Sequence, residues 1–311
     1  MKIIDRPSLA ELTTLRLGGT AVAEIRLDSL EDCERLPEAL SLVGGSAHVL
    51  GGGSNLLVHD GDLPITLVRP LMGSRAADGR PAEPEILGTE ERPDGRYTLL
   101  RVGAGMRVPF LLSWTVKHGL AGLEGLVGVP GRVGGAIAMN AGSYGCSTAP
   151  LLRSLTVFTP ERGLQELGPE GWCASYRHFS LAEPCSWYMS ASAVLAMKQA
   201  DPAELRSIMQ ENFLKKKSGQ PVHEHTAGCV FKNPEGQSAG RLLDEAGMKG
   251  RRRGALYFSE MHANFLAHDT KCGSPGRTED ALALIAEARD TVLERFGISL
   301  EMEVKEWPAW R

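Results

Sequence analysis

The sequence lacks an excess of basic charge, a long hydrophobic run and any closely spaced pair of cysteines, and each absence excludes a class of protein. Lys and Arg together number 34 against 38 for Asp and Glu, so the formal net charge of −4 argues against a nucleic-acid partner. No stretch approaches the ~20 apolar residues of a membrane span, and the opening residues MKIIDRPSLAELTTLRLGG contain no continuous apolar leader. We therefore expect a cytoplasmic protein that binds neither nucleic acid nor membrane.

The six cysteines are widely scattered, and none belongs to a C-x-x-C motif. Without such spacing and without a secretory leader, neither a disulfide framework nor a metal site is indicated. We expect six free thiols and no metal, and we assign five of the six the role of a small buried hydrophobic residue. Cys229 is the exception, because of the motif in which it stands.

A chain of 311 residues is long enough for more than one domain, and it shows no internal repeat. Apolar periodicity and capping residues predict helices over 30–42, 107–118, 201–217, 238–247 and 278–296. Apolar runs predict strands over 97–102, 154–159, 187–198 and 298–305. Short strands mixed with separate helices indicate an α+β fold, with a domain boundary at Asp201-Pro202, a pair that suits a helix start.

Glycine is the outlying residue, with 36 in the chain, and much of it is concentrated in runs. In the first run, Leu50-Gly-Gly-Gly-Ser-Asn55, one apolar segment leads into successive glycines and then directly into another. Backbone N–H groups can converge there without Cβ obstruction, which makes the run a candidate cradle for a diphosphate. It lacks the ending of a Walker loop and the following helix of a Rossmann fingerprint. Taken alone, a tight structural turn is the better interpretation.

The second run extends from Gly125 to Gly142 and places permissive backbone beside small residues over a long stretch. Such a surface can lie flat against a planar ligand. Together the two runs favour a nucleotide or flavin site over two unrelated turns.

The ordered motifs of the chain resemble one known family. They are GGGSN, VGAG at 102–105, GVPGRVGGA and NAGSYG, then Tyr176-Arg177, TAGCVFKNP at 226–234, SEMHANFLAH at 259–268 and LEMEV at 300–304. This set, which covers nearly the whole chain, resembles the shorter type of the UDP-N-acetylenolpyruvoylglucosamine reductase (MurB) family. The resemblance implies an FAD-binding fold of the vanillyl-alcohol oxidase type. Its two α+β subdomains would span 1–68 and 69–200, and an α+β substrate-binding domain would span 201–311.

The resemblance also implies where the cofactor binds. The diphosphate of FAD would lie on the first run, and the flavin ring would lie near the second. The implied residues are Gly51, Gly52, Gly53, Ser54 and Asn55 for the diphosphate, and Gly128, Gly131, Gly134, Gly135, Ala136, Asn140 and Gly142 for the second run.

Three residues match the catalytic positions of the family: Arg177, Cys229 and Glu303. Reduction of an enolpyruvyl ether sends hydride to the terminal vinyl carbon and throws negative charge onto the carbon beside the carboxylate. Arg177 would supply a fixed cationic fork for that carboxylate, and Cys229 would protonate the carbon. A carboxyl at Glu303 that stays protonated beside the developing charge would stabilise it further.

Two of these assignments leave alternatives open. The family's usual residue at the position of Cys229 is serine, so a buried, chemically inert cysteine is the alternative to a proton donor. In the predicted strand 298–305, Glu301 and Glu303 share the polar face, and periodicity cannot choose between them. The motif alone selects Glu303.

The resemblance implies further contacts to the substrate, from Tyr176, Lys217, Lys232, Asn233 and His262. A solvated helix end is the alternative for Lys217, and a hydrogen-bonded core histidine is the alternative for His262. The implied cofactor is bound FAD, the co-substrate is NADPH, and the substrate is UDP-N-acetylglucosamine enolpyruvate. Another FAD oxidoreductase of the same fold, or a non-catalytic flavin or nucleotide-sugar binding protein, remains the alternative function.

Overall fold

The computed structural model describes residues 1–308 and divides into two compact units, each built from separate stretches of the chain. Unit 1 comprises Met1–Asp5, Ala23–Gly51 and Thr66–Leu214. Unit 2 comprises Arg6–Val22, Gly52–Ile65 and the chain from Lys215 onward. Each unit contains its own hydrophobic core. The division into three consecutive regions at 68/69 and 200/201 stays a prediction.

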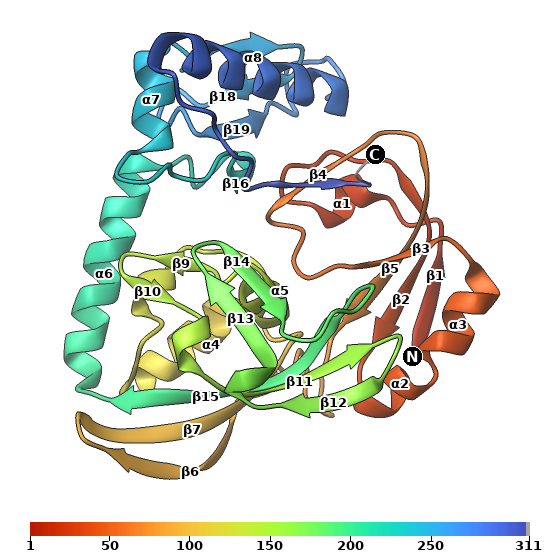
Figure 1. The fold of residues 1–311 in the computed structure, drawn as a ribbon, viewed down its shortest axis with the longest axis vertical. Coiled ribbons are helices and arrows are strands. Elements are labelled where there is room, and N and C mark those ends of the chain that lie inside the picture. Colours follow the sequence, from red (N-terminus) through yellow and green to blue (C-terminus); the bar gives the residue numbers. More distant parts are fainter. Residues whose placement is uncertain (309–311) are drawn as a thin grey trace. The chain divides into compact units, whose positions relative to one another are not determined.

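A large antiparallel sheet forms the centre of unit 1, with the strand order β12-β11-β15-β7-β6 and the short β8 paired with β15. Figure 1 shows β11, β15 and β7 running side by side. Its strands are β6 (Glu85–Arg92), β7 (Gly95–Gly103), β8 (Leu120–Ala121), β11 (Leu152–Thr159), β12 (Gly163–Leu167) and β15 (Met189–Gln199). The strands predicted over 97–102, 154–159 and 187–198 are thereby confirmed.

Two helices pack beside this sheet: α4 (Val108–Lys117) and α5 (Val133–Ala138). The helix predicted over 107–118 is confirmed as α4, which is followed by Gly119 at φ +66°. Apolar residues of both helices and of alternate positions in β7, such as Leu100 and Val102, form one buried cluster. The remaining short elements are η1 (Glu124–Leu126), β9 (Gly142–Ser143), β10 (Cys146–Ser147), η2 (Ala149–Leu151), η3 (Pro169–Gly171), β13 (Trp172–Ser175) and β14 (His178–Leu181).

A second sheet has the order β1-β2-β5-β3. Its strands are β1 (Lys2–Asp5), β2 (Thr20–Leu27), β3 (Ser46–Val49) and β5 (Asp62–Pro70). The single helix predicted over 30–42 is wrong, because the structure has α2 (Leu30–Glu34) and α3 (Leu36–Val43) with a break at Arg35. Pro37 has no N–H to continue the hydrogen-bond ladder of α2, and it occupies the first turn of α3 instead.

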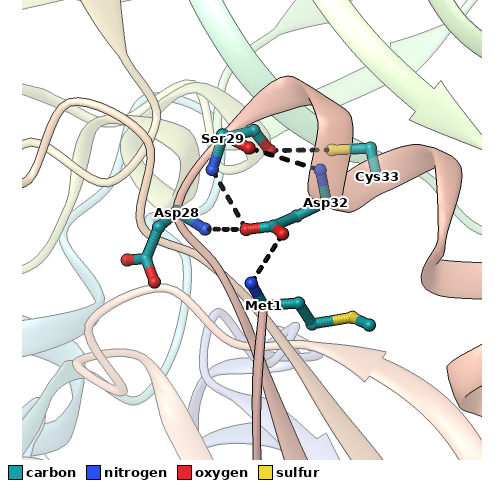
Figure 2. A network of polar contacts seen from close by, with 5 residues as sticks. All are labelled: Met1, Asp28, Ser29, Asp32 and Cys33. Atoms are coloured by element: carbon teal, nitrogen blue, oxygen red, sulfur yellow. Dashed lines mark hydrogen bonds and ion pairs between the residues drawn. The ribbon is translucent and has the colours of Figure 1, made fainter.

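The start of α2 is fixed by a capping box, as the spacing of Ser29 and Asp32 predicts. Figure 2 shows the Asp32 carboxylate accepting hydrogen bonds from the backbone N–H groups of Asp28 and Ser29 and from the amine of Met1. Burial alone would raise the pKa of Asp32, but these donors outweigh burial and lower it. The charged carboxylate therefore ties β1 to the turn that opens α2.

Unit 2 contains a four-stranded antiparallel sheet of order β16-β19-β18-β17, with α7 and α8 beside it (Figure 1). Its elements are β16 (His225–Cys229), α7 (Ala239–Glu245), β17 (Arg252–Arg253), β18 (Leu256–Phe258), β19 (Phe265–His268) and α8 (Thr278–Phe296). The helices predicted over 238–247 and 278–296 are confirmed, and Gly297 closes α8 in the left-handed conformation. Helix α6 (Pro202–Gly219), also as predicted, carries the chain from unit 1 into unit 2.

The end of the described chain differs from the prediction. No regular strand spans 298–305; of these residues Lys305 alone lies in a strand, β20 (Lys305–Trp307), which pairs in parallel with β4 (Leu56–Val58). Residues before β20 form a short bridge between Phe231 and Met302, with backbone hydrogen bonds on either side of it to Val230 and Lys232. Leu300 and Val304 are nevertheless buried. The alternation read from the sequence therefore reflects burial without a continuous ladder.

Candidate active site

The first glycine run lies between β3 and β4, as its flanking apolar residues predict. Gly53 has φ +65°, and a Cβ on it would come 2.0 Å from the carbonyl oxygen of Leu12. A Cβ on Gly51 would lie 3.4 Å from the Cα of Gly135, in the second run. The close backbone contact at Gly53 therefore requires glycine. At Gly51 the backbones of the two glycine runs approach each other, through Gly135 of the second run.

The second run forms a compact platform of backbone around α5. The N–H of Gly134 donates to the carbonyl of Ala104, in the VGAG segment, and a Cβ on Gly134 would lie 3.0 Å from the Cβ of Ala104. Gly128 and Gly131 have φ values of +74° and +109°, which other residues rarely adopt. The glycines of this run therefore allow close packing against the VGAG segment and sharp turns at Gly128 and Gly131, and backbone N–H groups without Cβ obstruction suit a dinucleotide cofactor.

Arg177 occupies a strained two-residue turn between β13 and β14. Its φ of +54° is uncommon for a residue with a side chain. Its guanidinium lies 5.0 Å from the centre of the Tyr176 ring, and Nη1 would be 3.2 Å from a Cβ on Gly142. Asn140 anchors the hairpin by donating from Nδ2 to the Ser175 carbonyl at 2.8 Å. Unit 1 thus brings together four residues that the sequence singled out.

Cys229 and Glu303 lie on adjacent segments of unit 2. Cys229 ends β16, and the carbonyl of the next residue, Val230, accepts a hydrogen bond from the N–H of Glu303 at 2.8 Å. On the other side, Asn55 Nδ2 donates to the Glu303 carbonyl at 3.1 Å, and the N–H of Lys305 donates to the Asn55 carbonyl at 3.0 Å. The backbone of Glu303 is therefore held between the cysteine segment and the glycine run.

The two glutamates of the terminal motif have different surroundings. Glu301 is exposed over 73% of its side chain and forms an ion pair with Lys232. Glu303 is half-buried. Lys232 is thus paired with Glu301, the glutamate that the sequence alternation could not distinguish from Glu303.

Asn233 and His262 have structural contacts of their own. Asn233 Oδ1 accepts the N–H of Ala239 at the start of α7. His262 Nδ1 accepts the N–H of Asn264, and its ring packs edge-on against Phe265. Burial lowers the pKa of His262, which favours the neutral ring.

One lysine at the end of α6 is buried, which the sequence analysis did not predict. Lys217, the predicted contact, is exposed, whereas the preceding Lys216 is only 5% exposed. A signal was available, because Lys216 follows the buried Leu205 by 11 residues, about three turns of one helix face. Lys216 is therefore the lysine of this run that is removed from solvent.

The cysteines are free thiols, as expected, but the expectation that five of them are small buried residues is wrong. Of those five only Cys33 is buried, whereas Cys146 and Cys185 are half-buried and Cys173 and Cys272 are exposed. Burial raises the pKa of Cys33 to about 12, so this thiol stays protonated and unreactive. Within residues 1–308, no group of His, Cys, Asp or Glu side chains is placed to hold a metal ion. No helix in that same part of the chain is long and apolar enough to cross a membrane.

Comparison with known proteins identifies two family domains. Residues 26–168 match the FAD binding domain, and residues 220–307 match the C-terminal domain of UDP-N-acetylenolpyruvoylglucosamine reductase. The first match contains the glycine runs and Asn140, and the second contains Cys229 and Glu303. The expected FAD-binding α+β fold and the FAD cofactor are thereby confirmed.

Similar proteins match along the whole length. UDP-N-acetylenolpyruvoylglucosamine reductases from Nitratidesulfovibrio vulgaris and Oleidesulfovibrio alaskensis are each 45% identical, over 98% of this chain and 98% of theirs. The crystal structure of the reductase from Thermus caldophilus aligns with a TM-score of 0.80 and 33% identity, over 99% of this chain and 100% of that one. The chain belongs to the UDP-N-acetylenolpyruvoylglucosamine reductase family.

Proposed function

We propose that this chain uses NADPH and bound FAD to reduce UDP-N-acetylglucosamine enolpyruvate to UDP-N-acetylmuramate, a precursor of peptidoglycan. The observation that carries the proposal is the hydrogen-bonded placement of the Cys229 and Glu303 segments beside Asn55, in a chain of this family. The bound FAD supplies the hydride chemistry, since a flavin can take hydride from NADPH and pass it to the substrate.

The residues of the chain deal with the charge that hydride transfer creates. When hydride reaches the terminal vinyl carbon, negative charge moves onto the neighbouring carbon and its carboxylate. Arg177 binds this carboxylate through its fixed, always-charged guanidinium. The strained turn that presents Arg177 supports this role, because strain of this kind is concentrated at functional sites.

Protonation then completes the reduction. The Cys229 thiol gives its proton to the carbon beside the carboxylate, and the new C–H bond takes up the electron pair of the carbanion. Glu303, as a protonated carboxyl, stabilises the same charge before the proton arrives. Tyr176, Lys217, Lys232, Asn233 and His262 are proposed to contact the substrate, Lys217 through its diphosphate.

Product analysis tests this function. Incubation of the protein with NADPH and UDP-N-acetylglucosamine enolpyruvate should give a nucleotide sugar heavier by two hydrogens, with one NADPH consumed for each product. Solvent deuterium should label the carbon beside the carboxylate, because that carbon receives its hydrogen as a proton from an exchangeable thiol. NADPH consumption without any change in mass of the sugar nucleotide would count against the proposal.

A further inference from the structure

Two arginines of unit 1 share one buried carboxylate. Glu24, on β2, is 1% exposed and accepts hydrogen bonds from Arg26 at 2.7 and 3.1 Å and from Arg69, on β5, at 2.8 Å. Burial would raise the pKa of Glu24, but these donors lower it below its ordinary value. Glu24 is therefore a charged carboxylate that is already paired with two guanidinium groups.

Two further arginines add positive charge at the same place. Arg132, the residue before α5, donates to the Gly105 carbonyl, and its surrounding charges are those of Arg69, Arg107 and Arg26. Arg107 pairs with Arg132 through a backbone bridge, is exposed, and has no ion pair in the described part of the chain. Arg26 is also attracted by the carboxylate of Asp28.

The arginine cluster, Arg26, Arg69, Arg107 and Arg132, thus holds positive charge in excess of its carboxylates. Burial and the neighbouring guanidinium groups lower the pKa of Arg132, an unfavourable arrangement without a compensating anion. Arg69 gives a second, independent indication. Its Nε is buried and donates to no acceptor in the described chain. A buried N–H without an acceptor is costly, and a bound ligand can supply one.

The cluster borders the segments that form the backbone platform. Arg132 contacts the carbonyl of Gly105, in VGAG, and precedes Gly135 by about one helical turn. Gly135 in turn meets Gly51 at the start of the first glycine run. Backbone amides in such a run carry no net charge, whereas a dinucleotide diphosphate carries two negative charges.

We propose that Arg132, Arg69 and Arg107 form a binding site for a nucleotide phosphate, and that this phosphate belongs to the diphosphate of bound FAD. The planar fork of Arg132 suits bidentate contacts to phosphate oxygens, Arg69 would donate from its Nε, and Arg107 contributes longer-range attraction. The proposal rests on the binding of FAD and is independent of which sugar nucleotide the protein reduces.

The test compares FAD with riboflavin, which has no phosphate, by flavin fluorescence during titration of the full-length apoprotein. Arg132→Met should raise the Kd for FAD about tenfold or more, since charge-assisted contacts to phosphate are lost, and leave the Kd for riboflavin unchanged. Arg96→Met is the matched control, because Arg96 is an exposed arginine of unit 1 paired with Glu91. It should leave both Kd values unchanged. Equal weakening of FAD and riboflavin by Arg132→Met would assign Arg132 a structural role and overturn the proposal.

Arg107→Met decides the question if Arg132→Met does not fold, because Arg107 is exposed and its side chain holds no ion pair in residues 1–308. This variant should weaken FAD roughly twofold to fivefold and flatten the dependence of Kd on salt, as expected for a lost charge near a phosphate. An unchanged Kd with an unchanged salt dependence contradicts the proposal.

The phosphates of NADPH have the same chemistry and form the second arm of the test. In the FAD-loaded Arg132→Met variant, the ratio of flavin reduction rates with NADPH and NADH should equal that of the parent. If the variant loses its response to NADPH but keeps parental affinity for FAD, the site binds the coenzyme phosphate and the assignment to FAD is wrong. The wild-type protein is titrated first, so a general failure to bind FAD is distinguished from a failure of the arginine site.

Discussion

At the scale of single residues, Cys229 is the position where this chain departs from the usual serine of its family. Cys229→Ser should retain substantial activity, because a hydroxyl of similar size replaces the thiol. Cys229→Ala should slow reoxidation of the reduced flavin by substrate by about 10²–10⁴, the range for loss of a general acid, and leave flavin reduction by NADPH nearly intact. Stopped-flow absorbance of the flavin measures both steps separately.

A control variant distinguishes the loss of any thiol from the loss of the proposed proton donor. Cys272→Ala removes an exposed cysteine of unit 2 and should leave both half-reactions at the parental rate. Bound substrate should also slow alkylation of Cys229, because the substrate covers the thiol. If Cys229→Ala turned over at the parental rate, Cys229 would be a packing residue and the proton would come from another group.

Gly142 tests the placement of Arg177. A Cβ on Gly142 would lie 2.8 Å from the Cys146 carbonyl oxygen and 3.2 Å from Arg177 Nη1, so Gly142→Ala must displace the guanidinium or the backbone. We expect slower flavin reoxidation by substrate, with a smaller effect on reduction by NADPH. Gly145→Ala is the control, because nothing lies within 4 Å of its Cβ. Equal rates in the two variants would mean that the position of Arg177 is unimportant.

The sequence could identify these residues by motif but could not assign their surroundings. Periodicity placed Glu301 and Glu303 on one face, and only the structure shows that Glu301 is paired with Lys232. The family resemblance selected Lys217 as a substrate contact, and the burial of the neighbouring Lys216 on the inner face of α6 was not predicted. Pairing and burial depend on partners distant in the sequence.

At the scale of elements, long periodic segments were predictable and short ones were not. Helix α8 has a strong apolar stripe and a closing Gly297, so both its extent and its end follow from the sequence. The segment over 298–305 alternates just as clearly, but it forms no strand before Lys305. Its hydrogen bonds go to Val230, Lys232 and Asn55, residues that the sequence pattern does not connect with it.

The turn of the first glycine run predicts a strong steric effect at Gly53. Gly53→Ala would place a Cβ 2.0 Å from the Leu12 carbonyl oxygen at a positive φ, and should lower the free energy of unfolding by roughly 3 kcal/mol. Gly61→Ala is the matched control, since Gly61 has φ +82° and open space around its Cβ. It should cost only about 1 kcal/mol. Urea denaturation measures both, and equal losses would contradict a steric role for Gly53.

At the scale of the whole molecule, stability should depend on pH through His262. Burial lowers the pKa of His262 from 6.5, so the folded chain resists a proton that the unfolded chain accepts. Stability is therefore full above that value and falls as the pH drops through it. Between about pH 7.5 and about pH 5.5, we expect a loss of stability that is smaller in His262→Gln. Urea denaturation measures both proteins at both pH values. An equal loss of unfolding free energy in parent and variant would exclude His262 as the source.

The fold class and family followed from ordered motifs, but the composition of the two units did not. Unit 2 joins three separate stretches through bonds such as Thr14 Oγ1 to the Thr226 carbonyl at 2.6 Å and Thr278 Oγ1 to the Val58 carbonyl. Bonds between residues more than 200 positions apart leave no trace in local periodicity. They become visible only in three dimensions.

The central claim is that bound FAD connects NADPH to an enolpyruvyl sugar nucleotide, and anaerobic stopped-flow absorbance tests it most directly. The protein as purified should be yellow and should release FAD, not FMN, on denaturation. NADPH should bleach the flavin band, and UDP-N-acetylglucosamine enolpyruvate added after NADPH is exhausted should restore it, faster than buffer alone. A flavin that NADPH reduces but this substrate cannot reoxidise contradicts the account.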